Sequence, residues 1–352
     1  MHQSERLIGH ARSVAAKTAL VLETNNLRGG DSATHALASL KRLIARLARQ
    51  TLAPQAFAQW IVTHDGLDAR AREEIVELAG RSVDFVEIGA HTGYYDAKNI
   101  GFDHVDASRC DYVAFGDADC QPAGNWLERL LAPFGESGAP PLAAVAGRTT
   151  YSASMTGAAL TTIDFMYFPS PLREGATRNF YANNVAFRRE VFEQYRYGKL
   201  DGVYRAHCQV MGLRLQDAGV VVQYAHDAHT EHRLPDTWRE TVKLRWMRGE
   251  DSVALTPYIV RAYLPRALQW FAHSGPIAPW CVMAGRLGFS LRALNHQGLP
   301  PVRGWRRAVT VALLVGISSV DTLGAVARGI GFGFGARRAL RRETQALSYH
   351  RH

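Results

Sequence analysis

The first half of the chain is constrained most strongly by an alternation of short apolar runs with helical patterns. The runs predict buried strands at four places: 19–24, 59–63, 83–88 and 112–115. The segments between them carry apolar residues at helical spacing, as Leu37, Leu40 and Ile44 do. Strands that alternate with helices in this way predict an α/β fold with a doubly wound, mostly parallel sheet.

Polar residues follow three of the predicted strands, at 23–26, 64–66 and 117–119. In sheets of this kind, ligands bind in the crevice outside the carboxyl ends of the strands. One polar strand end is unremarkable, because loops are polar in general. Three such ends, each after a buried strand, indicate one shared binding crevice.

The last of these strand ends carries two carboxylates, Asp117 and Asp119. In an extended chain these side chains point to the same side. Two hard oxygen ligands suit Mg2+ or Mn2+ held beside substrate phosphates. A solvated loop with two acids is the alternative interpretation. We expect Pro122 in the first turn of a following amphipathic helix that carries Trp126 and Leu130.

The residues Asp-Ala-Asp-Cys-x-Pro at 117–122, followed by Trp-Leu-Glu-Arg-Leu at 126–130, resemble the central motif of family 2 glycosyltransferases of the GT-A fold. The resemblance covers residues 18–250. It implies transfer of a sugar from a nucleotide-diphospho-sugar to an acceptor hydroxyl, with inversion, in cell-envelope or extracellular glycan synthesis. It also implies Mn2+ or Mg2+ on Asp117 and Asp119, with Asp119 acting in catalysis, and a glycan or lipid-linked acceptor.

Further donor-site residues follow from the resemblance. The family has a polar motif after the first strand, an aspartate after the second, and an Arg-Asn-x-Gly pattern on the third helix, which reads Lys-Asn-Ile-Gly at 98–101. The residues implied to bind the donor are Glu23, Thr24, Asn26, Asp65, Lys98, Asn99 and Asp117. On the acceptor side, the stretch 183–192 resembles Asn-x-Ala-Phe-Arg-Arg-x-x-Phe and implies that Asn183 and Asn184 bind sugar hydroxyls, although amides that cap the next helix would look alike.

The chain departs from the family at the general base. Family members place acids before a Leu-Gly-x-Arg-Leu helix, whereas His207-Cys208-Gln209 precedes Met-Gly-Leu-Arg-Leu here. Histidine is mostly neutral at cellular pH, so we predict His207 as the base. Asp201, another base on the acceptor side, or no base at all are the alternatives. The missing acids also allow a catalytically impaired GT-A-like protein that binds nucleotide-sugars or serves as a membrane-surface scaffold.

Three histidines, at 226, 229 and 232, follow at intervals of three residues. A separate zinc site needs all three in one tetrahedral arrangement, which this spacing does not fix. The family has a histidine near a proline at this place, so we predict His232, or next His229, as a further ligand of the donor-site metal.

An Arg-Trp-x-Arg-Gly sequence at 245–249 resembles a motif that membrane-linked members carry near the donor diphosphate. It implies donor contacts for Arg245 and Trp246, and an arginine fork suits phosphate oxygens. Val242 stands where the family has glutamine, so the match is partial. An amphipathic helix with a solvated basic face is the alternative.

The formal net charge of +9 favours acidic partners such as nucleotide phosphates or anionic lipids. Nine arginines and two acids lie from residue 303 onward, and no nucleic-acid recognition module is evident, so we predict no nucleic-acid partner. The region after residue 258 is aromatic, apolar and basic, which suits an anionic membrane surface. Packing onto the catalytic domain, or pairing with another subunit, fits the same composition.

The sequence predicts a cytoplasmic protein, with a peripheral position on the inner face of the cell membrane as the further option. The four cysteines are scattered, which favours a reducing compartment, and residues 1–18 lack the apolar core of a secretory signal. The longest apolar run, 308–320, is shorter than a membrane span. The predicted organisation is an N-terminal extension (1–17), a catalytic domain (18–250), a helical extension (251–336) and a basic tail (337–352).

Overall fold

The computed structural model describes residues 2–24, 30–135, 142–200, 203, 205–273, 277–295 and 299–329. Its strands are β1 (Thr18–Glu23), β2 (Gln59–His64), β3 (Asp84–Glu87), β4 (Tyr112–Asp117), β5 (Cys120–Pro122), β6 (Ala144–Thr150), β7 (Ala176–Thr177), β8 (Val185–Arg188) and β9 (Val222–His232). Its α-helices are α1 (His2–Ala15), α2 (Gly30–Leu47), α3 (Ala69–Ala79), α4 (Tyr94–Asp103), α5 (Trp126–Leu131), α6 (Met155–Asp164), α7 (Arg189–Tyr195), α8 (His207–Asp217), α9 (Trp238–Tyr263), α10 (Ile277–Ala293) and α11 (Gly304–Gly329). Short 3-10 helices are η1 (Pro54–Ala56), η2 (Ala132–Gly135) and η3 (Arg266–His273).

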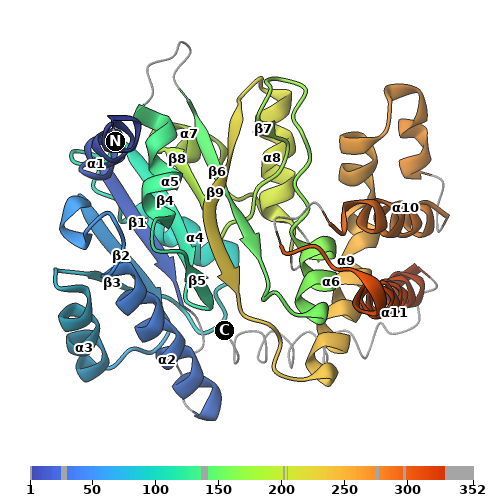
Figure 1. Ribbon diagram of the computed structural model, residues 1–352, viewed down its shortest axis with the longest axis horizontal. Coiled ribbons are helices and arrows are strands. Elements are labelled where there is room, and N and C mark those ends of the chain that lie inside the picture. Colours follow the sequence, from blue (N-terminus) through green and yellow to red (C-terminus); the bar gives the residue numbers. More distant parts are fainter. Residues whose placement is uncertain are drawn as a thin grey trace.

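The described strands form one mixed sheet in the order β3-β2-β1-β4-β8-β6-β9-β5, with β7 paired to β9 (Figure 1). Strands β3, β2, β1 and β4 are parallel, whereas β8 runs antiparallel to both β4 and β6. The predicted α/β fold with a mostly parallel sheet is therefore confirmed. Because β1 lies between β2 and β4, the carboxyl ends of three consecutive parallel strands meet at one edge.

Helices cover both faces of the sheet. Leu20 and Leu22 of β1 face a core shared with α1, α2, α3 and α5, whereas Val21 faces a second core shared with α4, α7 and α8. This alternation follows from the two-residue period of a strand. The predicted N-terminal extension is part of the first core, because Ala11 and Val14 of α1 are buried in it.

Two further segments differ from expectation. Pro122 lies in β5, at the edge of the sheet, and not in a helical turn. An edge strand tolerates proline because its missing N–H need not bond a neighbour. Helix α9 runs without a break through the predicted boundary at residue 250. Asn26, Asp201 and the basic tail 337–352 lie outside the described residues.

The helices α9, α10 and α11 stand beside α6, away from β1–β3 (Figure 1). A third apolar cluster joins α6 to α11 through Leu160, Ile163, Leu314 and Ile317. Helices α9 and α11 cross closely: a Cβ added at Gly249 would overlap the Asp321 carbonyl oxygen, and one at Gly324 would overlap that of Trp246. Larger residues at these two positions would force the helices apart.

Helix α11 is longer than the apolar run identified in the sequence. It has 26 residues and, among the described helices, is the one long and apolar enough to cross a membrane by length and composition. Of its most apolar window, 39% is buried inside the protein. Its Asp321 is buried at the crossing, where it pairs with Arg245 of α9.

Candidate active site

The predicted convergence of polar strand ends is present at the carboxyl edge of the parallel strands. Glu23, the last residue of β1, is in register with Thr63 of β2 on one side and Asp117 of β4 on the other. Asp65 follows β2 at the same edge and is 4% exposed. The hydroxyl of Thr24 is buried and has no hydrogen-bond partner among the described residues. This edge therefore offers several buried polar groups for a ligand.

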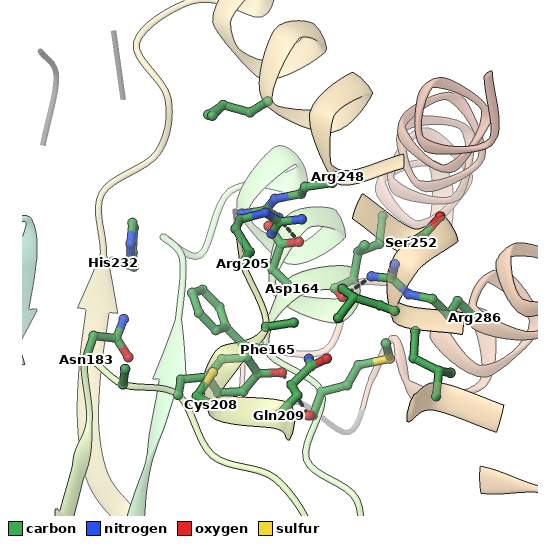
Figure 2. A pocket seen from close by; sticks show the side chains of 18 of the residues that line it. Asp164, Phe165, Asn183, Arg205, Cys208, Gln209, His232, Arg248, Ser252 and Arg286 are labelled. Carbon is green, nitrogen blue, oxygen red and sulfur yellow. Dashed lines mark hydrogen bonds and ion pairs between the residues drawn. The ribbon is translucent and has the colours of Figure 1, made fainter. Parts of the chain in front are cut away.

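A cavity of about 940 Å³ opens at this edge and continues toward the C-terminal helices. Glu23, Thr24, Asp117 and Asp119 line its sheet end, and α9, η3 and α10 supply much of the other end. In Figure 2, Asn183 and His232 lie on one side and Arg286 on the other, with Phe165 between them. The volume is near the upper end of the range for ligand pockets.

Asp117 is held from both sides. Lys98 Nζ donates to its Oδ1 at 2.5 Å, and Tyr94 Oη donates to its Oδ2 at 2.6 Å. Lys98 is fully buried, so it positions the carboxylate and does not line the cavity. Burial raises the pKa of Tyr94 well above its usual value, and the Asp117 carboxylate adds to the effect. Tyr94 lies one helical turn before Lys98, a spacing that places both on one face of α4.

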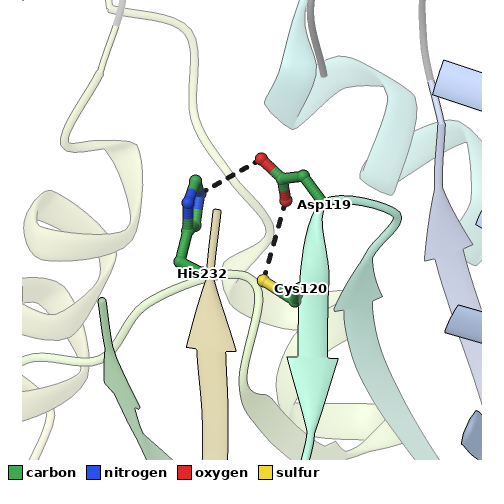
Figure 3. A group of neighbouring side chains, drawn as sticks. All are labelled: Asp119, Cys120 and His232. Carbon is green, nitrogen blue, oxygen red and sulfur yellow. Dashed lines mark hydrogen bonds and ion pairs between the residues drawn. The ribbon is translucent and has the colours of Figure 1, made fainter. Parts of the chain in front are cut away.

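Asp119, Cys120 and His232 form a cluster whose ligand atoms all lie within 4.8 Å of one another (Figure 3). The antiparallel pairing of β5 with β9 sets Cys120 opposite His232, which explains why these side chains meet. Cys120 was not predicted as part of this site. Burial, together with the Asp119 charge, raises the pKa of its thiol well above the usual value.

The tautomer of His232 suits a cation. Its Nδ1 lies 2.8 Å from the carbonyl oxygen of Arg233, which can only accept, so Nδ1 carries the proton. The lone pair of Nε2 then faces Asp119 Oδ2 at 3.3 Å. Two acceptors at this separation need positive charge between them, from a divalent ion or from a proton. Imidazole nitrogen and carboxylate oxygen are ligands that Mn2+ accepts, so the residues present fit the predicted ion.

The other predicted metal ligands are placed differently. His229 projects to the opposite side of β9 from His232, because successive strand residues alternate, and its Nε2 meets Thr150 Oγ1 at 2.9 Å. Burial lowers the pKa of His229 to about 4, and nearby Arg148 contributes. Asp117 is absent from the cluster, and each of its oxygens already accepts a hydrogen bond from Lys98 or Tyr94.

Of the predicted amide contacts that the structure describes, Asn183 alone lines the cavity, where it donates to Cys120 Sγ at 3.4 Å. Asn184 is fully buried; its oxygen accepts from Trp126 and its amide donates to the carbonyls of Arg148 and Ala228. Asn99 bonds the backbone of Tyr197 with both ends of its amide. Asn184 and Asn99 therefore join segments of the fold and do not reach a ligand.

His207, the predicted base, is the first residue of α8 and stacks on Tyr95, with ring centroids 4.3 Å apart. It is not among the residues that line the cavity, although its neighbours Ala206 and Cys208 are. Burial lowers its pKa to about 4. The imidazole is therefore neutral at pH 7 but only weakly basic, which makes it a poor general base.

Arg245 and Trp246 do not line the cavity. The Arg245 guanidinium is buried between Asp164 of α6 and Asp321 of α11, and the Trp246 ring donates to Glu250. The Arg-Trp-x-Arg-Gly motif does not indicate these two ion pairs, because Asp164 and Asp321 lie 81 and 76 residues from Arg245 in the chain. Arg248 of the same motif does line the cavity, and it pairs with Asp164.

Two more arginines that the sequence did not single out, Arg205 and Arg286, also line the cavity. Burial lowers the pKa of Arg286 to about 10, so it remains charged at pH 7. Burial lowers the pKa of Arg205 as well, opposed by the charge of Asp251. These side chains come from the segment before α8 and from α10, so only the folded chain brings them together.

The comparisons with known proteins concern the sheet region and the fold. A family model described as glycosyl transferase family 2 matches residues 33–196. Among solved structures, the mannosyltransferase PcManGT from Pyrobaculum calidifontis, in complex with GDP-Man and Mn2+, has a TM-score of 0.51 and 13% identity, over 99% of this chain and 94% of that one. TarS 1–349 of S. aureus, in complex with UDP, has a TM-score of 0.44 and 10% identity, over 90% and 93%. No curated protein matches this sequence.

Proposed function

We propose that the chain transfers a sugar from a nucleotide-diphospho-sugar, with inversion and with a bound Mn2+ or Mg2+. The match of residues 33–196 to glycosyl transferase family 2 and the similarity of the fold to that of a mannosyltransferase support this proposal. The observation that carries this proposal is the pairing of Asp119 with Nε2 of His232, 3.3 Å apart, at the edge where the strand ends meet. The mannosyltransferase named above, which holds GDP-Man and Mn2+, supports the same chemistry.

In this mechanism the sheet end of the cavity binds the donor. The buried Thr24 hydroxyl offers a hydrogen bond to the nucleotide, and Lys98 and Tyr94 keep Asp117 in one orientation beside it. Asp119 and His232 would hold the ion, which would supply positive charge for the leaving diphosphate. The acceptor then enters from the C-terminal end of the cavity and approaches Asn183.

A second candidate is a protein that binds nucleotide-sugars, or serves as a membrane-surface scaffold, without transferring the sugar. It is favoured by one observation: His207-Cys208-Gln209 precede the Met-Gly-Leu-Arg-Leu stretch, where the family has acids. Hydrolysis or transfer of the sugar, measured over hours with several donors, separates the two candidates. Binding without any turnover across a broad acceptor panel would favour the second.

The proposal is tested by thermal shift with UDP-, GDP- and dTDP-sugars, each with and without Mn2+. We expect one nucleotide to raise the melting temperature only when Mn2+ is present, because a ligand that binds the folded state stabilises it. Asp119→Asn should lose this shift, whereas Asp227→Asn, whose side chain is 75% exposed on β9, should keep it. A full shift in Asp119→Asn would refute the assignment of the metal site.

We place this activity in cell-envelope or extracellular glycan synthesis at the cytoplasmic face of the membrane. Support comes from large apolar side chains exposed on the C-terminal helices: Trp270, Trp280, Trp305 and Leu323. Aromatic side chains of this kind are typical of membrane-interface segments. Co-sedimentation of the full chain with anionic vesicles, compared with neutral ones, tests this placement.

A further inference from the structure

The C-terminal end of the cavity has an apolar wall. Leu255, Ile259 and Val260 of α9 line it, together with Phe271 of η3 and Phe289 of α10. Nucleotides and sugars are polar, so this wall matches neither part of the donor. The ring centroid of Trp270 lies 5.9 Å from that of Phe271, and Trp270 is 64% exposed, so the apolar surface continues from the wall to the outside of the protein. An apolar chain that extends from the cavity to the outside would be covered by these residues.

Cationic side chains lie within this same wall. Arg248 is 16% exposed and pairs with Asp164, but its Nε is buried without a partner among the described residues. Arg286 makes a long hydrogen bond, 3.5 Å, to the carbonyl oxygen of Ile163, and the described part of the chain shows no carboxylate within ion-pair distance of it. Arg286 is partly buried. A cation in such a place without a close counter-ion is unfavourable, so an anion from a ligand would be stabilised beside it.

The carboxylates that line the cavity beyond the metal end are already engaged. Asp164 binds Arg245 and Arg248, Asp236 accepts two hydrogen bonds from Arg233, and Glu240 accepts one from the backbone of Asp236. His207 is a poor base for the reason given above. An acceptor hydroxyl would therefore find no prepared base, whereas a phosphate monoester is already ionised at pH 7 and needs none.

We propose that the acceptor is a lipid monophosphate, whose apolar chain lies along α9, η3 and α10 and whose phosphate is bound by the arginines of this wall. This inference rests on the proposed glycosyl transfer and names its acceptor. A phosphate oxygen forms the bond to the anomeric carbon while the bond from that carbon to the donor diphosphate breaks, and the electron pair leaves with the nucleoside diphosphate. No proton is transferred, and the product is a sugar phosphodiester of the lipid.

The first test is binding of three probes to the full chain by calorimetry: farnesyl phosphate, farnesol and inorganic phosphate. Farnesyl phosphate should bind at least tenfold more tightly than either of the others, because it alone carries both the chain and the charge. Inorganic phosphate that binds as tightly would identify a simple anion site, and farnesol that binds as tightly would identify a simple apolar pocket. Either result would overturn the proposal.

Variants of α10 test the role of the Arg286 charge. Arg286→Met should weaken farnesyl phosphate at least tenfold and leave farnesol unchanged. Arg292→Met, at an exposed position of the same helix, should bind both as the parent does. The nucleotide-dependent thermal shift with Mn2+ is measured in parallel. If Arg286→Met loses that shift, or if nucleotide and farnesyl phosphate compete, the arginines belong to the donor site and the proposal fails.

The last test uses the product. With a radiolabelled nucleotide-sugar and farnesyl phosphate, label should move into the organic phase and be released by mild acid, because sugar phosphodiesters are acid-labile. Label that resists mild acid would indicate a glycoside of a hydroxyl and would overturn the proposal. A normal thermal shift without farnesyl phosphate binding would also overturn it, and would leave the glycosyltransferase function standing.

Discussion

The crossing of α9 and α11 gives a prediction that can be worked from the coordinates, with Gly324→Ala as the perturbation. The added Cβ would lie inside 3.0 Å of the Trp246 carbonyl oxygen and 3.0 Å from its carbon, both backbone atoms that no rotamer change can move. Gly316 lies two turns earlier on α11 and has nothing within 4 Å of an added Cβ, so Gly316→Ala is the matched control.

Both substitutions gain the same helix propensity, about 0.5–1 kcal/mol from glycine to alanine. The difference between them is therefore the steric cost alone, which for overpacking is about 1–3 kcal/mol. We expect the upper end of that range, because two helix backbones must separate. Gly316→Ala should melt at or above the parent temperature, and Gly324→Ala about 5 °C below Gly316→Ala.

The assay is a thermal melt of both variants at one scan rate, followed by farnesyl phosphate binding. Since α9 carries Arg248 into the cavity, its displacement in Gly324→Ala should also weaken that binding. Equal melting temperatures for the two variants would refute the close packing of these helices. A large loss in Gly316→Ala would refute the open environment assigned to its position.

Three further outcomes are expected. His232→Ala should weaken Mn2+ binding at least tenfold, about 1.4 kcal/mol, whereas His229→Ala should leave it unchanged, as titration of the nucleotide-dependent thermal shift with Mn2+ will show. Tyr94→Phe removes a hydrogen bond to a carboxylate and should lower the free energy of unfolding, measured with denaturant, by about 1.5–3 kcal/mol. Tyr95→Phe loses only a contact to a thiol and should lower it less. The reverse order would contradict this geometry. His207 has a folded pKa of about 4, below the 6.5 of an unfolded histidine, so the unfolded state takes up the proton first as pH falls and stability is lost between pH 6.5 and 4. His207→Phe should therefore lose less melting temperature between pH 7 and 4.5 than the parent, and should retain transferase activity; a complete loss of turnover with the fold intact would restore His207 as the base.

The sequence could predict those parts of the site that lie in, or directly after, a strand. Apolar runs and the polar residues directly after them fix the strand ends, so Glu23 and Asp117 are predicted at one edge and are found there. Asp65 follows β2 at the same edge but does not line the cavity. His232 was predicted beside the metal, and its pairing with Asp119 follows from the β5–β9 register. Local patterns sufficed because each residue is placed by its own strand.

The parts that could not be predicted depend on contacts between distant segments. Arg245 is turned away from the cavity by Asp321 of α11, whereas Asp164 of α6 pairs with both Arg245 and Arg248. Asn99 and Asn184 carry amides that could bind a sugar, but these amides already donate hydrogen bonds to backbone carbonyls of distant segments, at Tyr197 and Ala228. Cys120 could have been found from the pairing of β5 with β9, which sets it opposite His232, had an edge strand been expected in place of a helical turn.

The buried Asp321 has a consequence for how α11 presents its outer surface. Rotation of this helix about its long axis would move the Asp321 carboxylate away from Arg245 and into the apolar cluster between α6 and α11. The ion pair therefore fixes the rotation of α11 about its axis. The stripe formed by Trp305, Val309 and Leu323 is consequently aimed in one fixed direction. A lipid bilayer that binds this stripe would therefore bind the protein in one orientation only. The Arg245–Asp321 ion pair would then determine how the whole catalytic domain is oriented relative to the membrane.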